Sequence, residues 1–162
     1  MVEGVPIEQG PEVAAISGHP RVARVHITNL TLNGEGATFF ETLDELLDNV
    51  AGLHQYDREG TSSLTFHIPV VPEGKDLLDR LEKAAADHGG SMEVETEHAA
   101  VSVVGTGVLD APSVIARAHR ALAASGISPA SVVTGNLSVT FLVPHGAFEK
   151  AQQSLHTEFL ES

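Results

Sequence analysis

The stretch AVSVVGTGVLDAPSVIARAHRALAASGI, residues 100–127, decides the fold. It opens with an almost unbroken apolar run, which is typical of a buried strand, and continues through the Gly105-Thr106-Gly107 loop. Asp110 and Pro112 then provide the signals that open a helix, and Gly126 provides the signal that closes it. The stretch therefore predicts a strand, a tight loop and an amphipathic helix.

Downstream of this stretch, residues 127–134 and 137–143 form two extended runs around Gly135-Asn136, a pattern that predicts a β-hairpin. A last apolar stripe at helical spacing predicts a C-terminal helix and consists of Phe148, Ala151, Leu155 and Phe159. This half of the chain is one strand short of the four that a ferredoxin-like sheet needs to shield its edge. We expect residues 12–17, at the other end of the chain, to supply the missing strand.

Upstream, the same order of elements occurs once more. Apolar residues at steps of three and four predict the helices, and alternation of apolar and polar residues predicts the strands. The predicted elements, in chain order, are strands over 12–17 and 22–28 separated by Gly18-His19-Pro20, a helix over 36–49, strands over 50–56 and 63–70 around a turn at 57–60, a helix that ends at Gly89-Gly90 with a left-handed cap, and a strand over 92–96. The first half thus has the order β-α-β-β-α-β.

The predicted fold class is α+β, with two ferredoxin-like βαββαβ units whose helices cover one face of antiparallel sheets. The first domain is expected over 20–98. The second is expected over 99–162, completed by the N-terminal strand over 12–17. No linker separates the two.

The charge, the hydropathy and the absence of Cys exclude several classes of partner and site. The 162 residues carry 9 Lys and Arg against 22 Asp and Glu, a net charge of −13, which argues against nucleic acid as a partner. No signal peptide or apolar run of membrane-spanning length is present, so we expect a cytoplasmic protein without a membrane partner. Because the chain has no Cys, thiolate nucleophiles and zinc–cysteine sites are excluded, and we expect no cofactor.

Residues 100–127, together with VVTGNLSVTFLV (132–143) and AFEKAQQSLHTEFL (147–160), resemble the second ACT domain of the aspartokinase regulatory region. EGTSSLTFHIP (59–69) resembles the first ACT domain of the same family, and Gln55 falls on the glutamine position of its second strand. The resemblance covers about residues 12–161. The chain has neither the glycine loops nor the length of an amino-acid-kinase domain, so it resembles a separately made regulatory subunit.

The resemblance implies a function. Tandem ACT units of the family pair between chains and bind a small amino acid at the ACT–ACT interface. We therefore expect a homodimer that binds an amino-acid effector and regulates an aspartokinase-like, amino-acid-kinase catalytic subunit. The ligand-binding positions that the resemblance implies are Asn33, Gly34, Glu35, Gly36, Gln55, Ser113, Ile127, Ser128 and Thr134.

This sequence departs from the family pattern at several of these positions. The loop over 31–36 keeps Gly34 but lacks the family's Asp and Pro, which removes a partner for the ligand's amino group. Ser113 stands in place of a Gly, and Ser128 and Pro129 replace an Asn-Ile pair. Of a family Ser-Thr-Ser segment only Thr134 keeps its hydroxyl. The pattern favours a retained fold with either altered ligand specificity or a decayed site.

Other polar residues have simpler interpretations. His26 and His67 alternate away from the apolar strand positions and are weak candidates for a metal or pH-responsive patch, but an ordinary polar face is the favoured interpretation. The acidic residues Asp44, Glu45 and Asp48 are expected on the wet side of their helix, and His119 and His156 on solvated or packed helix edges.

Three hypotheses for function stand after this reading. The leading one is a noncatalytic ACT regulatory protein. The second is a degenerate ACT dimer that acts as a structural or interaction module without a ligand. The third is an enzyme with unrelated chemistry on this fold, for which no catalytic dyad stands out in the sequence.

Overall fold

The computed structural model describes residues 12–70 and 74–161 and divides into two compact units. The N-terminal unit is His19–His98. The C-terminal unit joins residues 12–18 to residues 99–161. Two long strands, β1 (Val13–Leu30) and β4 (Ser91–Gly105), contribute to both units. In the described part of the chain no helix is long and apolar enough to cross a membrane.

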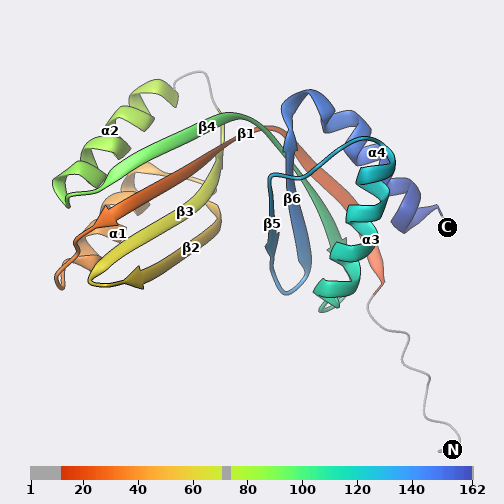
Figure 1. The fold of residues 1–162 in the computed structure, drawn as a ribbon, viewed down its shortest axis with the longest axis horizontal. Coiled ribbons are helices and arrows are strands. Elements are labelled where there is room, and N and C mark those ends of the chain that lie inside the picture. The colour runs from red at the N-terminus through yellow and green to blue at the C-terminus, as the bar shows by residue number, and fades with distance from the viewer. Residues whose placement is uncertain (1–11, 71–73, 162) are drawn as a thin grey trace, which may run out of the picture. The chain divides into compact units, whose positions relative to one another are not determined.

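The N-terminal unit has the predicted β-α-β-β-α-β order (Figure 1). Between the two long strands lie α1 (Gly36–Leu46), β2 (Ala51–Arg58), β3 (Thr61–Pro69) and α2 (Gly74–Asp87). Hydrogen bonding places the strands in the order β2-β3-β1-β4, with β3 antiparallel to both β1 and β2. The core lies between one face of this sheet and the helices and includes Val25, Ile27, Phe39, Leu43, Leu64, Phe66, Leu81 and Ala85.

The C-terminal unit repeats the plan with α3 (Ala111–Ala124), β5 (Ser131–Thr134), β6 (Ser138–Pro144), a 3-10 turn (His145–Ala147) and α4 (Phe148–Leu160). Its strands follow the order β1-β4-β6-β5, so the N-terminal segment of β1 fills the fourth place and confirms the predicted donated strand. Val13 and Ile16 of this segment pack on a core that includes Val101, Val103, Leu122, Phe141 and Leu155.

One prediction about the strands is wrong: Gly18-His19-Pro20 does not divide the N-terminal extended segment. β1 is continuous over 18 residues. The structure requires a glycine at position 18 for lack of space and not for a turn. A Cβ at this position would lie 2.7 Å from Cε1 of Phe148 and 2.9 Å from the carbonyl oxygen of Ala100. Pro20 is compatible with extended backbone. In the same way β4 is one strand of 15 residues where two strands were expected, an alternating one over 92–96 and an apolar one over 100–104.

The turns follow the local chemistry of their residues. Glu59 and Gly60 both have positive φ (52° and 84°), which closes the β2–β3 hairpin with two left-handed residues. Gly89 has φ of 76°, and the N–H of Gly90 donates to the Ala85 carbonyl at 2.8 Å, so α2 ends in the predicted left-handed cap.

The strand predicted over 127–134 begins later, at Ser131. Gly126 (φ 75°) caps α3, and the N–H of Ile127 donates back to the Leu122 carbonyl at 2.9 Å, which keeps Ile127 in the end of the helix. The predicted helix over 36–49 likewise ends at Leu46, because Leu47 is extended and Asn49 has φ of 58°.

Candidate functional site

The loop between β1 and α1 contains three of the expected ligand-binding residues, Asn33, Gly34 and Glu35, and the fourth, Gly36, is the first residue of α1. Asn33 and Gly34 have positive φ (45° and 83°), and the N–H of Glu35 donates to the Leu32 carbonyl at 2.6 Å, so the loop is a tight turn that leads directly into the helix. Glu35 is the N-cap residue but makes no side-chain capping hydrogen bond. A Cβ added to Gly34 would meet no atom within 4 Å. The turn therefore leaves open space beside the start of α1.

Gln55 lies on β2, the edge strand of the N-terminal unit, opposite Leu64 of β3. Leu64 is fully buried on the helix-covered face, so Gln55 extends that face to the exposed edge of the sheet. The side-chain Nε2 of Gln55 donates to Oδ1 of Asp57 at 3.3 Å. The same Oδ1 accepts a short hydrogen bond from Oγ of Ser62. Asp57 and Ser62 were not anticipated from the sequence.

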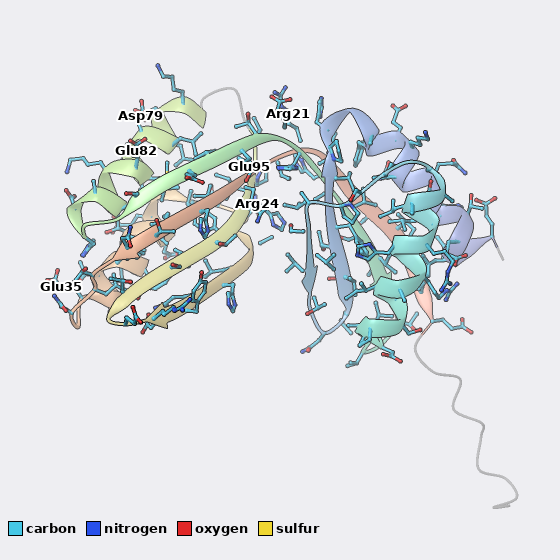
Figure 2. All side chains as sticks on the ribbon, viewed as in Figure 1. Arg21, Arg24, Glu35, Asp79, Glu82 and Glu95 are labelled. Atoms are coloured by element: carbon cyan, nitrogen blue, oxygen red, sulfur yellow. The ribbon has the colours of Figure 1, made fainter. Side chains whose placement is uncertain are left out.

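Strand register relates this polar group to the loop. Asp57 pairs with Ser62, and Ser62 pairs with Leu30, the last residue of β1 before the loop. Adjacent strands lie about 4.8 Å apart, so the Cα atoms of Asp57 and Leu30 are separated by roughly 10 Å. The loop and the Gln55–Asp57 pair thus belong to the same end of the N-terminal sheet. Figure 2 shows Glu35 at that end.

The expected residues of the C-terminal unit fall at two ends of it: Ser113 and Thr134 lie towards the end where the β4–α3 loop hydrogen-bonds to the β5–β6 turn, and Ile127 and Ser128 lie at the other. Ser113 is exposed in the first turn of α3, and Thr134 is exposed at the end of β5. Ile127 and Ser128 follow the other end of α3, a 14-residue helix about 21 Å long. The side chain of Ile127 is part of the core, so only its backbone faces outward.

The loop of the C-terminal unit is held by its neighbours. The N–H of Gly105 donates to the Leu137 carbonyl at 2.7 Å, and the N–H of Leu109 donates to the Asn136 carbonyl at 3.3 Å. The N–H of Thr106 donates to the Glu12 carbonyl at 2.9 Å. Side chains crowd Gly105, where an added Cβ would lie 2.5 Å from Cδ2 of Leu109. We call this loop closed, because its N–H groups are used by neighbouring carbonyls and its Gly105 is crowded. The loop of the N-terminal unit is open, because Gly34 has free space beside it.

His26 and His67 lie on one face of the sheet, on adjacent strands and two residues out of register: His26 pairs with Thr65 and His67 with Arg24. Nδ1 of His26 is 2.7 Å from Oγ1 of Thr65. Burial lowers the pKa of His67, which favours the neutral ring. Among residues 12–70 and 74–161 no group of three or more His, Asp or Glu side chains is arranged to hold a metal ion.

The other polar residues of interest are surface features. Asp44, Glu45 and Asp48 are exposed, and the ring of His119 packs edge-on against Phe141 with centroids 6.2 Å apart. The hydrogen bond from His98 lowers the pKa of Glu95, and Arg24 contributes in the same direction (Figure 2). Hydrogen bonds from His156 and Thr157 lower the pKa of Glu161. These residues provide no pocket in which two acid–base groups meet.

Comparison with known proteins identifies the C-terminal unit. Residues 101–159 match the family model of the ACT domain. They form an ACT domain. The ACT match covers α3, β5, β6 and α4, and it includes the loop over 105–110 and the positions Ser113, Ile127, Ser128 and Thr134.

The similarity extends beyond this ACT domain to the N-terminal unit. The aspartokinase of Bacillus sp. (strain MGA3) is 30% identical over 161 residues, which cover 97% of this chain and 39% of that relative. The regulatory subunit of aspartate kinase from Thermus thermophilus, in its ligand-free form, superposes with a TM-score of 0.73 at 23% identity and covers 91% of this chain and 98% of its own. The resemblance to the aspartokinase regulatory region, with its tandem ACT fold, is therefore confirmed.

A third comparison involves a bound structure. Aspartokinase III from E. coli in complex with lysine and aspartate has a TM-score of 0.57 at 20% identity, with 94% of this chain and 34% of that chain covered. The chain thus spans 38–39% of the length of two curated aspartokinases to which it is similar and 98% of a regulatory subunit structure.

Proposed function

We propose that this chain is a noncatalytic regulatory protein that binds a small free amino acid and controls a separate aspartokinase-type catalytic subunit. The observation that carries the proposal is the match along 91% of the chain to a regulatory subunit that is itself covered to 98%. The structure of the E. coli relative in complex with lysine and aspartate supports an amino acid as the ligand.

The N-terminal unit has the chemistry that a zwitterion requires. A ligand carboxylate needs backbone N–H donors, which the turn at Asn33 and Gly34 and the start of α1 offer in open space. A ligand ammonium needs oxygen acceptors, which Gln55 and its neighbours on β2 offer. We place the principal site at this end of the N-terminal unit.

A homodimer is part of the proposal, because large apolar side chains are exposed along the edge strand of the N-terminal unit. Val50, Leu53 and Tyr56 are 37%, 51% and 47% exposed on or beside β2. A groove of about 300 Å³ lies next to them, lined by residues of α1 and β2 that include Phe40 and Leu53. An unpaired edge with exposed large side chains favours pairing with a second chain. A ligand bound between chains would then tighten the dimer.

Thermal denaturation against the twenty free L-amino acids, each at millimolar concentration, tests ligand binding. A ligand at 100 times its Kd adds about 2.7 kcal/mol to the stability of the native state. A rise in Tm with one or a few amino acids supports the proposal and names the effector. Sedimentation velocity with and without that amino acid then tests whether binding strengthens the dimer, and a monomer at micromolar concentration in both states would overturn the interchain site.

The alternative is a degenerate module that pairs but binds no ligand. The closed loop of the C-terminal ACT domain favours it for that unit, because Gly105, Thr106 and Leu109 use their N–H groups within the chain. A uniformly flat amino-acid panel with a well-folded dimer would support this alternative for both units.

A further inference from the structure

We propose that Asp57 is the anionic partner of the ligand's ammonium group in the N-terminal unit and makes the site selective for primary amines. This inference rests on the proposed amino-acid site. It addresses what the loop over 31–36 leaves open, since that loop lacks an acidic residue at the family's Asp position.

Asp57 is an exposed carboxylate that is fixed in place by a buried hydroxyl. Ser62 is 5% exposed, and it and His67 are the buried polar side chains in the part of the chain that the structure describes. Oγ of Ser62 donates to Oδ1 of Asp57, and Nε2 of Gln55 donates to the same oxygen at 3.3 Å. A solvated surface carboxylate does not need such an anchor, because water satisfies it.

The hydrogen bonds leave one oxygen of each side chain free. Oδ2 of Asp57 and Oε1 of Gln55 accept no hydrogen bond from residues 12–70 and 74–161, and Asp57 forms no salt bridge with them. A carboxylate can only accept, so it orients the Gln55 amide with its NH2 group inward and its oxygen outward. The pair therefore offers two acceptors on one strand face, with the negative charge of Asp57, and an ammonium group supplies three matching donors.

Glu35 is another acidic residue near this end of the sheet, and its position suits a different role. As the N-cap residue of α1 it lies at the backbone donors that a ligand carboxylate would use. Asp57 lies across β3 from the end of β1, and by strand spacing its Cα atom is roughly 10 Å from that of Leu30, the residue before the loop. An amino acid could therefore span the two, with its carboxylate at the loop and its ammonium at Asp57.

The C-terminal ACT domain has no equivalent group. Residues 62–69 (SSLTFHIP) align with 137–144 (LSVTFLVP), which puts Leu137 in the place of Ser62. Leu137 is 53% exposed and cannot anchor a carboxylate. The inference thus assigns ammonium recognition to the N-terminal unit.

Isothermal titration of the full chain with the twenty L-amino acids and their N-acetyl derivatives tests this role. The Asp57→Asn variant keeps Oδ1 as the acceptor for Ser62 but removes the charge and replaces the acceptor Oδ2 with an NH2 group, so we expect its Kd for the best amino acid to rise about 10- to 100-fold, the contribution of one charged hydrogen bond. The N-acetyl derivative, which has no ammonium, should bind wild type and variant equally weakly. Asp48→Asn, another exposed acid of this unit, should change Kd less than about twofold.

The outcomes separate this inference from the proposed function. Wild-type binding that survives in Asp57→Asn overturns the role of Asp57 and leaves the amino-acid sensor standing. No binding of any amino acid to wild type overturns both. If Asp57→Asn does not fold, Ser62→Ala takes its place, because it frees the carboxylate to rotate without removing it, and an unchanged Kd in that variant overturns the proposed orientation.

Discussion

The two units share a helix-facing pattern and differ at the strand ends. SLTFHIP at 63–69 and SVTFLVP at 138–144 place Phe66 and Phe141 at equivalent core positions, 1% and 0% exposed. The loop of the N-terminal unit is open at Gly34, while the loop of the C-terminal unit is tied to its hairpin and to Glu12. The difference teaches that the repeat maintains the core, while the strand-end residues, where we propose that the ligand binds, are not constrained by the core.

The largest expected effects test whether the two units share an equivalent core. Phe66→Ala and Phe141→Ala each remove a buried ring from an equivalent position, so each should lower the free energy of unfolding by about 3–5 kcal/mol. Urea denaturation followed by circular dichroism measures both. The exposed Leu137→Ala is the control, with an expected change below about 0.5 kcal/mol. A loss below about 1 kcal/mol for one Phe alone would break the equivalence of the two cores.

A second test concerns the strand that completes the C-terminal unit. In Gly18→Ala the added Cβ would lie 2.7 Å from Phe148 and 2.9 Å from a backbone oxygen of Ala100, so it should cost about 1–3 kcal/mol. Gly146→Ala is the matched control, since nothing lies within 4 Å of its Cβ position. The urea midpoints of both variants provide the measurement. Equal stability of the two variants would show that β1 does not pack tightly against Phe148 at Gly18.

A third test uses a position that is a histidine in the N-terminal unit and a leucine in the C-terminal unit. His67 corresponds to Leu142, and both are buried, 7% and 1% exposed. Because burial lowers the pKa of His67 below its usual value near 6.5, the unfolded chain binds more protons than the folded chain in the window just below that value. Stability is therefore fully present above pH 6.5 and lost as the pH falls through that window.

His67→Leu should remove this loss, so its Tm should fall less than that of wild type between pH 7.5 and pH 5.5. The lowered pKa values of Glu95 and Glu161 act below the usual glutamate value near 4.5 and do not interfere in this range. Parallel pH profiles for the two proteins would show that His67 titrates with its usual pKa in the folded state.

Local periodicity in the sequence predicted the order of elements, because alternation and helical spacing report which face is buried, and the missing fourth strand of the second unit predicted the donated strand. It did not predict that β1 runs through Gly18-His19-Pro20, since Gly and Pro signal a turn unless packing from Phe148 is known. The Asp57–Ser62 hydrogen bond was not predicted for a related reason. Cross-strand pairs depend on the strand register, and the two-residue turn at Glu59 and Gly60 sets that register.

The smallest expected effect sharpens the contrast between the loops without any substitution. The N–H groups of Gly105, Thr106 and Leu109 donate to carbonyls outside their own loop, so their hydrogen exchange should be slowed. Asn33 and Gly34 donate to no backbone carbonyl in the described part of the chain, so their amides should exchange nearly as fast as those of an unstructured peptide. Amide exchange by NMR resolves each residue. The amino acid selected by the thermal panel should slow Asn33 and Gly34 and leave Gly105 unchanged, because a carboxylate bound at the open loop engages the free N–H groups directly. Slowing at Gly105 instead would place the ligand at the C-terminal ACT domain and reverse the comparison.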